Sequence, residues 1–91
     1  MGVSANSTVT NGQMITPEIA LLSHLIERNP AQPVYYVLRG EEWLACGHPD
    51  KARPDFLAAR DRAAELFVQA EWGYILQAYV DRAEAGLLEC R

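Results

Sequence analysis

Cysteine, basic start signals and long apolar runs are scarce in this 91-residue sequence, and each scarcity excludes a class of protein. Two cysteines, Cys46 and Cys90, are too few for a disulfide scaffold. No apolar run approaches the roughly 20 residues that a membrane-spanning helix needs, so we expect no membrane partner. The opening residues lack the basic start and apolar core of a secretory signal. A reduced, cytoplasmic location is therefore expected.

Positive charge is also in short supply. Twelve acidic residues outweigh eight lysines and arginines, which gives a net charge of −4. Nucleic acids and anionic membrane surfaces bind proteins through a basic stripe, and this sequence shows none. We therefore expect no nucleic-acid partner.

Catalytic and cofactor-binding motifs are missing from the sequence as well. It contains no phosphate-binding glycine loop, Ser–His–Asp spacing or helical zinc motif. Two weaker candidates are present. The first is a zinc site formed by Cys46, His48, Cys90 and His24. The second is an acid–base pair formed by His24 and Glu27. The first lacks a C-x2-C core, and the second is more typical of a surface contact on a helix. We expect a protein that is not an enzyme and that holds no cofactor or metal.

Residues that favour helices dominate what remains. Alanine, leucine, glutamate and arginine are frequent, and 49% of the residues are apolar, which is enough for a packed core. Residues 1–14 are rich in Ser, Thr, Asn and Gly, and we interpret them as a flexible N-terminal tail. Residues 15–91 are predicted to form a single all-α domain.

The first helix is predicted to begin after Thr16 and to end at Asn29. Thr16 can cap free backbone amides, Pro17 has the fixed φ that suits a first turn, and Glu18 faces the positive end of the helix dipole. Pro30 pushes the residue before it out of the α region, which ends the helix.

The second helix is predicted from Pro33 to about Cys46, and the third from about Asp50 into the low sixties. Gly47 is placed to end the second helix, since a helix often closes on a glycine with positive φ. Pro54 falls close to the start of the third helix, where a missing backbone amide is tolerated.

The helix boundaries beyond residue 60 are poorly marked, because Gly73 is the one helix breaker before residue 80. We predict a fourth helix over Glu65–Tyr79 and a short fifth helix from about Arg82. Asp81 and Glu84 have the spacing of a capping box at that last start. One long helix across the sixties and seventies is the alternative.

Small and aromatic residues follow one another at regular spacing in the middle of the chain. They are, in order, Tyr36, Gly40, Trp43, Gly47, Ala52, Phe56 and Ala59. The small residues let two antiparallel helices approach closely, and the aromatic residues fill the space between them. Over residues 33–66 the pattern resembles the tetratricopeptide repeat (TPR), whose signature of W-x2-L-G-x2-Y, A-x3-F and P has a period of about 34 residues. Arg39 and Ala64 depart from it, where leucine and the closing proline are usual.

The resemblance implies a fold and a function. The fold would be an antiparallel helix-hairpin array of about four or five helices, a fragment of a right-handed α-α superhelix. The function would be that of a protein-binding adaptor, cochaperone or assembly subunit, which binds an apolar or amphipathic segment in a groove. The groove residues implied by the resemblance are Val34, Val37, Glu41, Leu44 and Ala45.

Self-association is the alternative function. Repeats bury their faces against neighbours, so about three or more are normally needed, and this chain has about two and a half. Apolar residues near the C-terminus lack an obvious partner in the sequence, namely Trp72, Ile75, Leu76 and Leu87. We therefore predict either a protein or peptide partner, or a homo-oligomer whose role is assembly.

Overall fold

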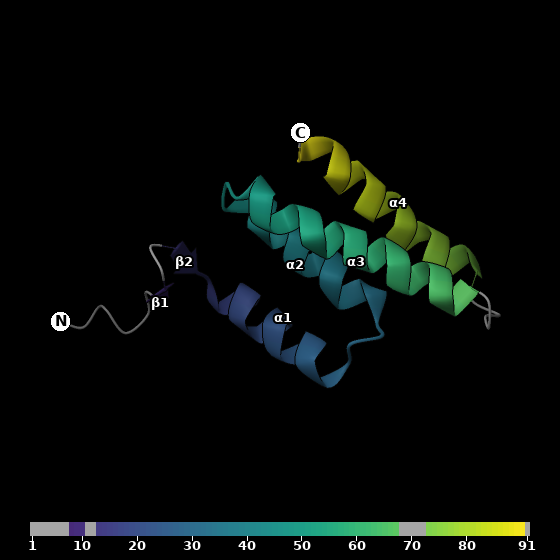
Figure 1. The fold of residues 1–91 in the computed structure, drawn as a ribbon, viewed down its shortest axis with the longest axis horizontal. Coiled ribbons are helices and arrows are strands. Elements are labelled where there is room, and N and C mark those ends of the chain that lie inside the picture. Colours follow the sequence, from purple (N-terminus) through teal and green to yellow (C-terminus); the bar gives the residue numbers. More distant parts are fainter. Residues whose placement is uncertain (1–7, 11–12, 68–72, 91) are drawn as a thin grey trace.

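Four helices make up the packed part of the chain in a computed structural model that describes residues 8–10, 13–67 and 73–90 (Figure 1). The elements in order are β1 (Thr8–Thr10), β2 (Gln13–Ile15), α1 (Pro17–Arg28), α2 (Pro33–Ala45), α3 (Pro49–Phe67) and α4 (Gly73–Glu89). The predicted all-α fold class is confirmed. Within the described ranges, no helix is both long enough and apolar enough to cross a bilayer.

The helices are arranged around the pair formed by α2 and α3. These two run antiparallel, α1 packs against α2, and α4 packs against both α3 and α2 (Figure 1). Because α4 also runs antiparallel to α3, α2 and α4 point in the same direction. The arrangement is consistent with the predicted helix-hairpin array.

A short antiparallel hairpin precedes the first helix. Thr8 of β1 lies opposite Ile15 of β2, and Thr10 lies opposite Gln13. The sequence predicted a flexible tail over residues 1–14. The structure instead pairs these two strands there, and residues 1–7 and 11–12 lie outside the described part. Each strand is three residues long, so neither is long enough to give a recognisable alternating pattern.

Both ends of α1 are closed by local side-chain contacts, of which the Thr16 cap was predicted and the Asn29 contact was not. The Ile19 amide donates to the Thr16 hydroxyl at 3.1 Å, and Pro17 is the first helical residue. At the other end, the side-chain amide of Asn29 donates to the Leu25 carbonyl at 2.9 Å. These contacts satisfy backbone groups that have no partner inside the helix.

The turn between α2 and α3 is a Schellman motif centred on Gly47, which has a φ of 81°. The Gly47 amide donates to the Leu44 carbonyl at 3.0 Å, and the His48 amide donates to the Trp43 carbonyl at 2.9 Å. The His48 ring packs edge-on against Trp43, with the ring centroids 5.6 Å apart. A Cβ at Gly47 would meet nothing within 4 Å, so the backbone conformation alone favours glycine here.

The C-terminal half differs from its prediction. Helix α3 continues to Phe67, and Gly73 begins α4 instead of lying inside a helix. The predicted fourth helix over Glu65–Tyr79 is therefore wrong, and so is one long helix, because α4 folds back along α3 (Figure 1).

The predicted fifth helix is also wrong, because α4 passes through Arg82 without a break. Asp81 does not cap a helix start. Its carboxylate accepts a hydrogen bond of 2.8 Å from the Gln77 side chain, four residues earlier in the same helix. Asp81 and Glu84 both lie inside α4, where their side chains are exposed to solvent.

The core is built around the Phe56 ring, which is fully buried. A Cβ added to Gly40 of α2 would lie 2.7 Å from this ring, and one added to Gly86 of α4 would lie closer still. The ring therefore contacts the backbone of both helices. The surrounding buried residues come from all four helices and include Ile19, Ile26, Tyr36, Val37, Trp43, Ala52, Ala59 and Ala83.

We expect Gly40→Ala to destabilise the protein, although alanine is the better helix former. The new methyl group would press on the Phe56 ring, and Gly86 on the other side leaves the ring no room to move. Overpacking of this kind costs about 1–3 kcal/mol, against a gain of at most about 1 kcal/mol in helix propensity. Urea unfolding followed by circular dichroism measures the difference.

The matched control is the same substitution in a Phe56→Leu background. The smaller side chain should relieve the contact, so Gly40→Ala should cost less there than in the wild type. Equal or higher stability of Gly40→Ala in the wild-type background would contradict the packing described for Phe56.

Candidate functional site

An ion pair joins α2 and α4 at the surface. The Arg82 guanidinium donates to both carboxylate oxygens of Glu41, with distances of 2.6 Å from Nη2 and 3.1 Å from Nε. The hydrogen bonds to Glu41 raise the pKa of Arg82 above its ordinary value. The side chains of Arg82 and Glu41 are 46% and 38% exposed, so the pair lies in the open between the two helices.

Two stripes of exposed or half-buried residues extend from this pair. The stripe on α2 consists of Val34, Leu38, Glu41 and Ala45, and the stripe on α4 consists of Ile75, Ala78, Arg82, Ala85 and Glu89. Their spacing of three or four residues places each stripe on one side of its helix. We call the surface formed by both stripes the α2–α4 face.

The two stripes are in register. Val34 and Ile75 each precede the ion-paired residue of their own helix by seven positions. Because α2 and α4 point the same way, these two residues lie at the same end of the face, about 10 Å from the ion pair at 1.5 Å per residue. Leu38 and Ala78 lie between, so this end is apolar.

The structure divides the five residues that were predicted to line a groove. Three of them lie on the α2–α4 face: Val34, Glu41 and Ala45. Val37 is 0% exposed and belongs to the core, and the half-buried Leu44 packs against that core. Val37 therefore cannot contact a ligand in this structure. Leu38 was not among the predicted groove residues, although it lies on the α2–α4 face between Val34 and Glu41.

The apolar residues near the C-terminus that the sequence left without a partner have different surroundings. Ile75 is exposed and lies on the α2–α4 face, whereas Leu87 is half-buried and Leu76 is buried. The expectation of an uncovered Leu76 is therefore wrong, because this residue faces the other helices. Trp72 lies outside the described residues.

A second polar cluster connects α1, α2 and α3. Arg39 donates from Nε and Nη2 to the two carboxylate oxygens of Asp55 at 2.8 and 2.6 Å, and from Nη1 to the Ser23 hydroxyl at 2.9 Å. The hydrogen bonds to Asp55 raise the pKa of Arg39, although burial opposes the shift. Sequence analysis did not find this cluster, because its members lie 16 residues apart and have no local motif.

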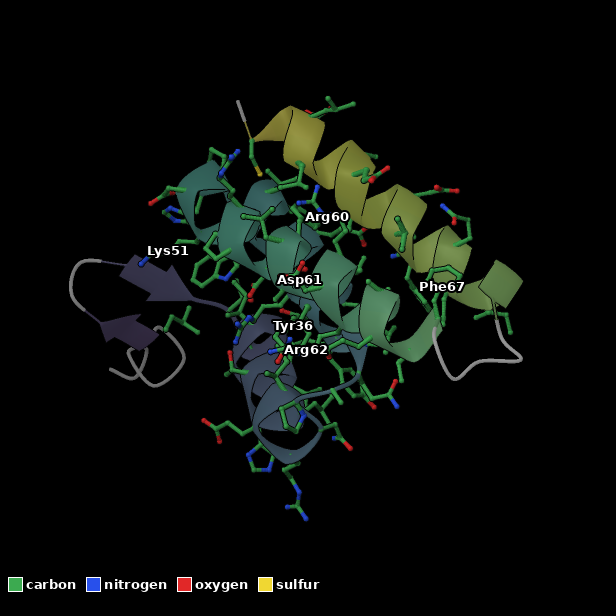
Figure 2. The ribbon with its side chains drawn as sticks, turned by 45° about the vertical axis from the view of Figure 1, so that its right-hand side comes forward. Tyr36, Lys51, Arg60, Asp61, Arg62 and Phe67 are labelled. Atoms are coloured by element: carbon green, nitrogen blue, oxygen red, sulfur yellow. The ribbon has the colours of Figure 1, made fainter. Side chains whose placement is uncertain are left out.

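The connection between α1 and α2 is held by α3. The Tyr36 hydroxyl and the Arg62 guanidinium both donate to the Pro30 carbonyl at 2.9 Å. Arg62 also lies over the Tyr36 ring, 5.8 Å from its centroid (Figure 2). The contact is a cation–π interaction, and it fixes the start of α2 against α3.

The residues considered for zinc or acid–base chemistry have other surroundings. Cys46 and Cys90 are half-buried and pack against the core, His48 packs on Trp43, and His24 is exposed on α1. Partial burial raises the pKa of the Cys90 thiol, which disfavours the reactive thiolate. In the parts of the chain that the structure describes, no three His, Cys, Asp or Glu residues are grouped so that they could hold a metal.

Comparisons with protein-family models, curated proteins and solved structures find no match to this chain. The TPR resemblance therefore stays a prediction that depends on residue spacing.

The two interhelical ion pairs should differ in their effect on stability. Asp55→Ala should lower the free energy of unfolding by about 3 kcal/mol, because the carboxylate is 6% exposed and its loss leaves a half-buried Arg39 without its partner. Glu41→Ala, the matched change at the exposed pair, should cost at most about 1 kcal/mol. Chemical denaturation of both variants checks this, and equal losses would show that the two pairs are energetically equivalent.

Proposed function

We propose that this chain is a non-enzymatic, TPR-like protein-binding module that holds an apolar or amphipathic segment of another protein on its α2–α4 face. The main support is that α2 is apolar on two sides. One side faces the core through Tyr36, Val37 and Trp43. The other side carries Val34 and Leu38 at the surface. Apolar side chains on a helix side that faces away from the core are typical of a surface that another protein covers.

The charged residues in the middle of the face favour binding over chemistry. Glu41 and Arg82 neutralise each other through a bidentate contact that joins α2 to α4. The packing of Phe56 against Gly40 and Gly86 sets the separation of α2 and α4, and the ion pair bridges the two stripes at that separation. A bound segment could therefore meet a surface that is formed before it arrives, which lowers the entropy lost on binding.

Self-association is the second candidate function, and an observation on α1 favours it. Leu21 is 58% exposed and lies on the side of α1 that faces away from the buried Ile19 and Ile26. In repeat arrays the outer faces of terminal units are usually polar. An apolar residue at this position would be covered if a second copy packed against α1.

The binding proposal predicts that the double variant Val34→Asp, Leu38→Asp loses its protein partner. Both side chains are only half-buried, so charge at these positions should repel an apolar segment while leaving the helices intact. Affinity capture from the native cells followed by mass spectrometry compares the partners, and circular dichroism checks the helix content. Charged residues at Val37 would not give a clean test, because Val37 is in the core.

Leu21→Asp is the control, since it places an aspartate on an exposed leucine of α1, away from the α2–α4 face. It should capture the same partners as the wild type. Recovery of these partners by the Val34→Asp, Leu38→Asp variant would move the binding site off this face.

The self-association candidate predicts a different result for Leu21→Asp. The wild type would elute as an oligomer, and this variant would be a monomer, because the charge prevents a second copy from covering α1. Light scattering coupled to gel filtration measures both masses. A stable wild-type monomer at high micromolar concentration would remove this candidate.

A further inference from the structure

The end of the α2–α4 face opposite Val34 and Ile75 is acidic. Glu42 borders the α2 stripe in the last turn of α2, and Glu89 is the last residue of α4. Within residues 8–10, 13–67 and 73–90, no lysine or arginine lies within ion-pair distance of either carboxylate. Both carboxylates are therefore available to a cation from outside.

Helix dipoles add to the negative potential at this end. The C-terminal end of a helix carries a partial negative charge, and basic residues usually occupy the last turn. Both α2 and α4 end here, and neither has a basic residue in its last turn. Each last turn instead carries a glutamate, whose negative charge is unfavourable beside the negative end of the helix dipole.

Helix α3 offsets part of this potential, but from a different side. Its N-terminal end, which is the positive end of its dipole, begins here with Pro49. Burial raises the pKa of the nearby Cys90 thiol, and the charge of Arg53 opposes that rise, so Arg53 also lies near this end. However, neither Arg53 nor Lys51 forms an ion pair with Glu42 or Glu89 in the described part of the chain.

From this arrangement we infer that the occupant of the α2–α4 face is a segment of another protein with apolar side chains at one end and Lys or Arg at the other. Its apolar side chains would cover Val34, Leu38 and Ile75, and its cations would meet Glu42 and Glu89. This inference rests on the proposed binding function and specifies the chemistry of the partner. A second copy of this chain fits the face poorly, because its net charge of −4 would bring like charges together.

The spacing of the partner follows from the helix rise. Glu42 lies eight residues after Val34, and Glu89 lies fourteen residues after Ile75. At 1.5 Å per residue these separations are about 12 and 21 Å. A helical partner would therefore place its basic residues about two to four turns from its apolar ones.

A displayed peptide library tests this inference. The probe is a library of helical peptides with fixed apolar residues on one side and random residues elsewhere, selected against the wild-type chain. We expect the selected peptides to carry more Lys and Arg than Asp and Glu, gathered toward one end. The affinity of a selected peptide is then measured by fluorescence polarisation against variants of the chain.

The double variant Glu42→Lys, Glu89→Lys should weaken binding of the selected peptide by about tenfold or more, because it places like charges opposite the cations of the peptide. The variant should fold, since lysine suits the last turn of a helix better than glutamate does. The matched control is Glu18→Lys, Glu27→Lys, which changes the net charge equally at two exposed positions of α1 and should bind like the wild type.

Two outcomes separate the inference from the function on which it rests. The basic partner would be overturned, and the binding face left in place, if the selected peptides were acidic or uncharged. The same conclusion would follow if Glu42→Lys, Glu89→Lys bound the peptide with full affinity while Val34→Asp lost binding. Failure to select any peptide, or binding that Val34→Asp does not weaken, would overturn the proposed function together with the inference.

Discussion

The contact of Phe56 with two glycines determines how the helices are spaced. Its ring lies against Gly40 of α2 on one side and Gly86 of α4 on the other. Each glycine weakens its own helix by about 1 kcal/mol relative to alanine, and burial of the aromatic ring offsets part of that loss. Because the same ring sets the approach of both helices to α3, it also sets the distance between α2 and α4. The Glu41–Arg82 contact and the surface around it depend on that distance.

Sequence analysis placed helix ends correctly where the local side chains define them. The hydrogen bonds at Thr16 and Gly47 join residues at most five positions apart, so a short stretch of sequence is enough to predict these helix ends. The predicted boundaries around α4 were wrong because the same residue types occur both at helix starts and at exposed positions inside helices. Asp81 followed by Glu84 has the spacing of a helix start, but here both are exposed positions inside a helix.

The candidate site could be predicted only in part, because its contacts join distant segments. Glu41 was placed at the surface from its position in the repeat pattern, but its partner Arg82 is 41 residues away. Gly86 was not recognised as a contact of Phe56, since a sequence does not show which small residue will meet a given ring. Arg39 stood out in the sequence only as a departure from the repeat pattern, whereas in the structure it holds Asp55 and Ser23 on neighbouring helices.

The even number of antiparallel helices in the described part of the chain returns the backbone to the end from which it started. The start of α1 and the end of α4 consequently lie toward the same end of the helix array, which is also the end where α2 finishes (Figure 1). The β1–β2 hairpin therefore lies toward the end that carries the carboxylates, and the turn between α1 and α2 lies toward the end of Val34 and Ile75.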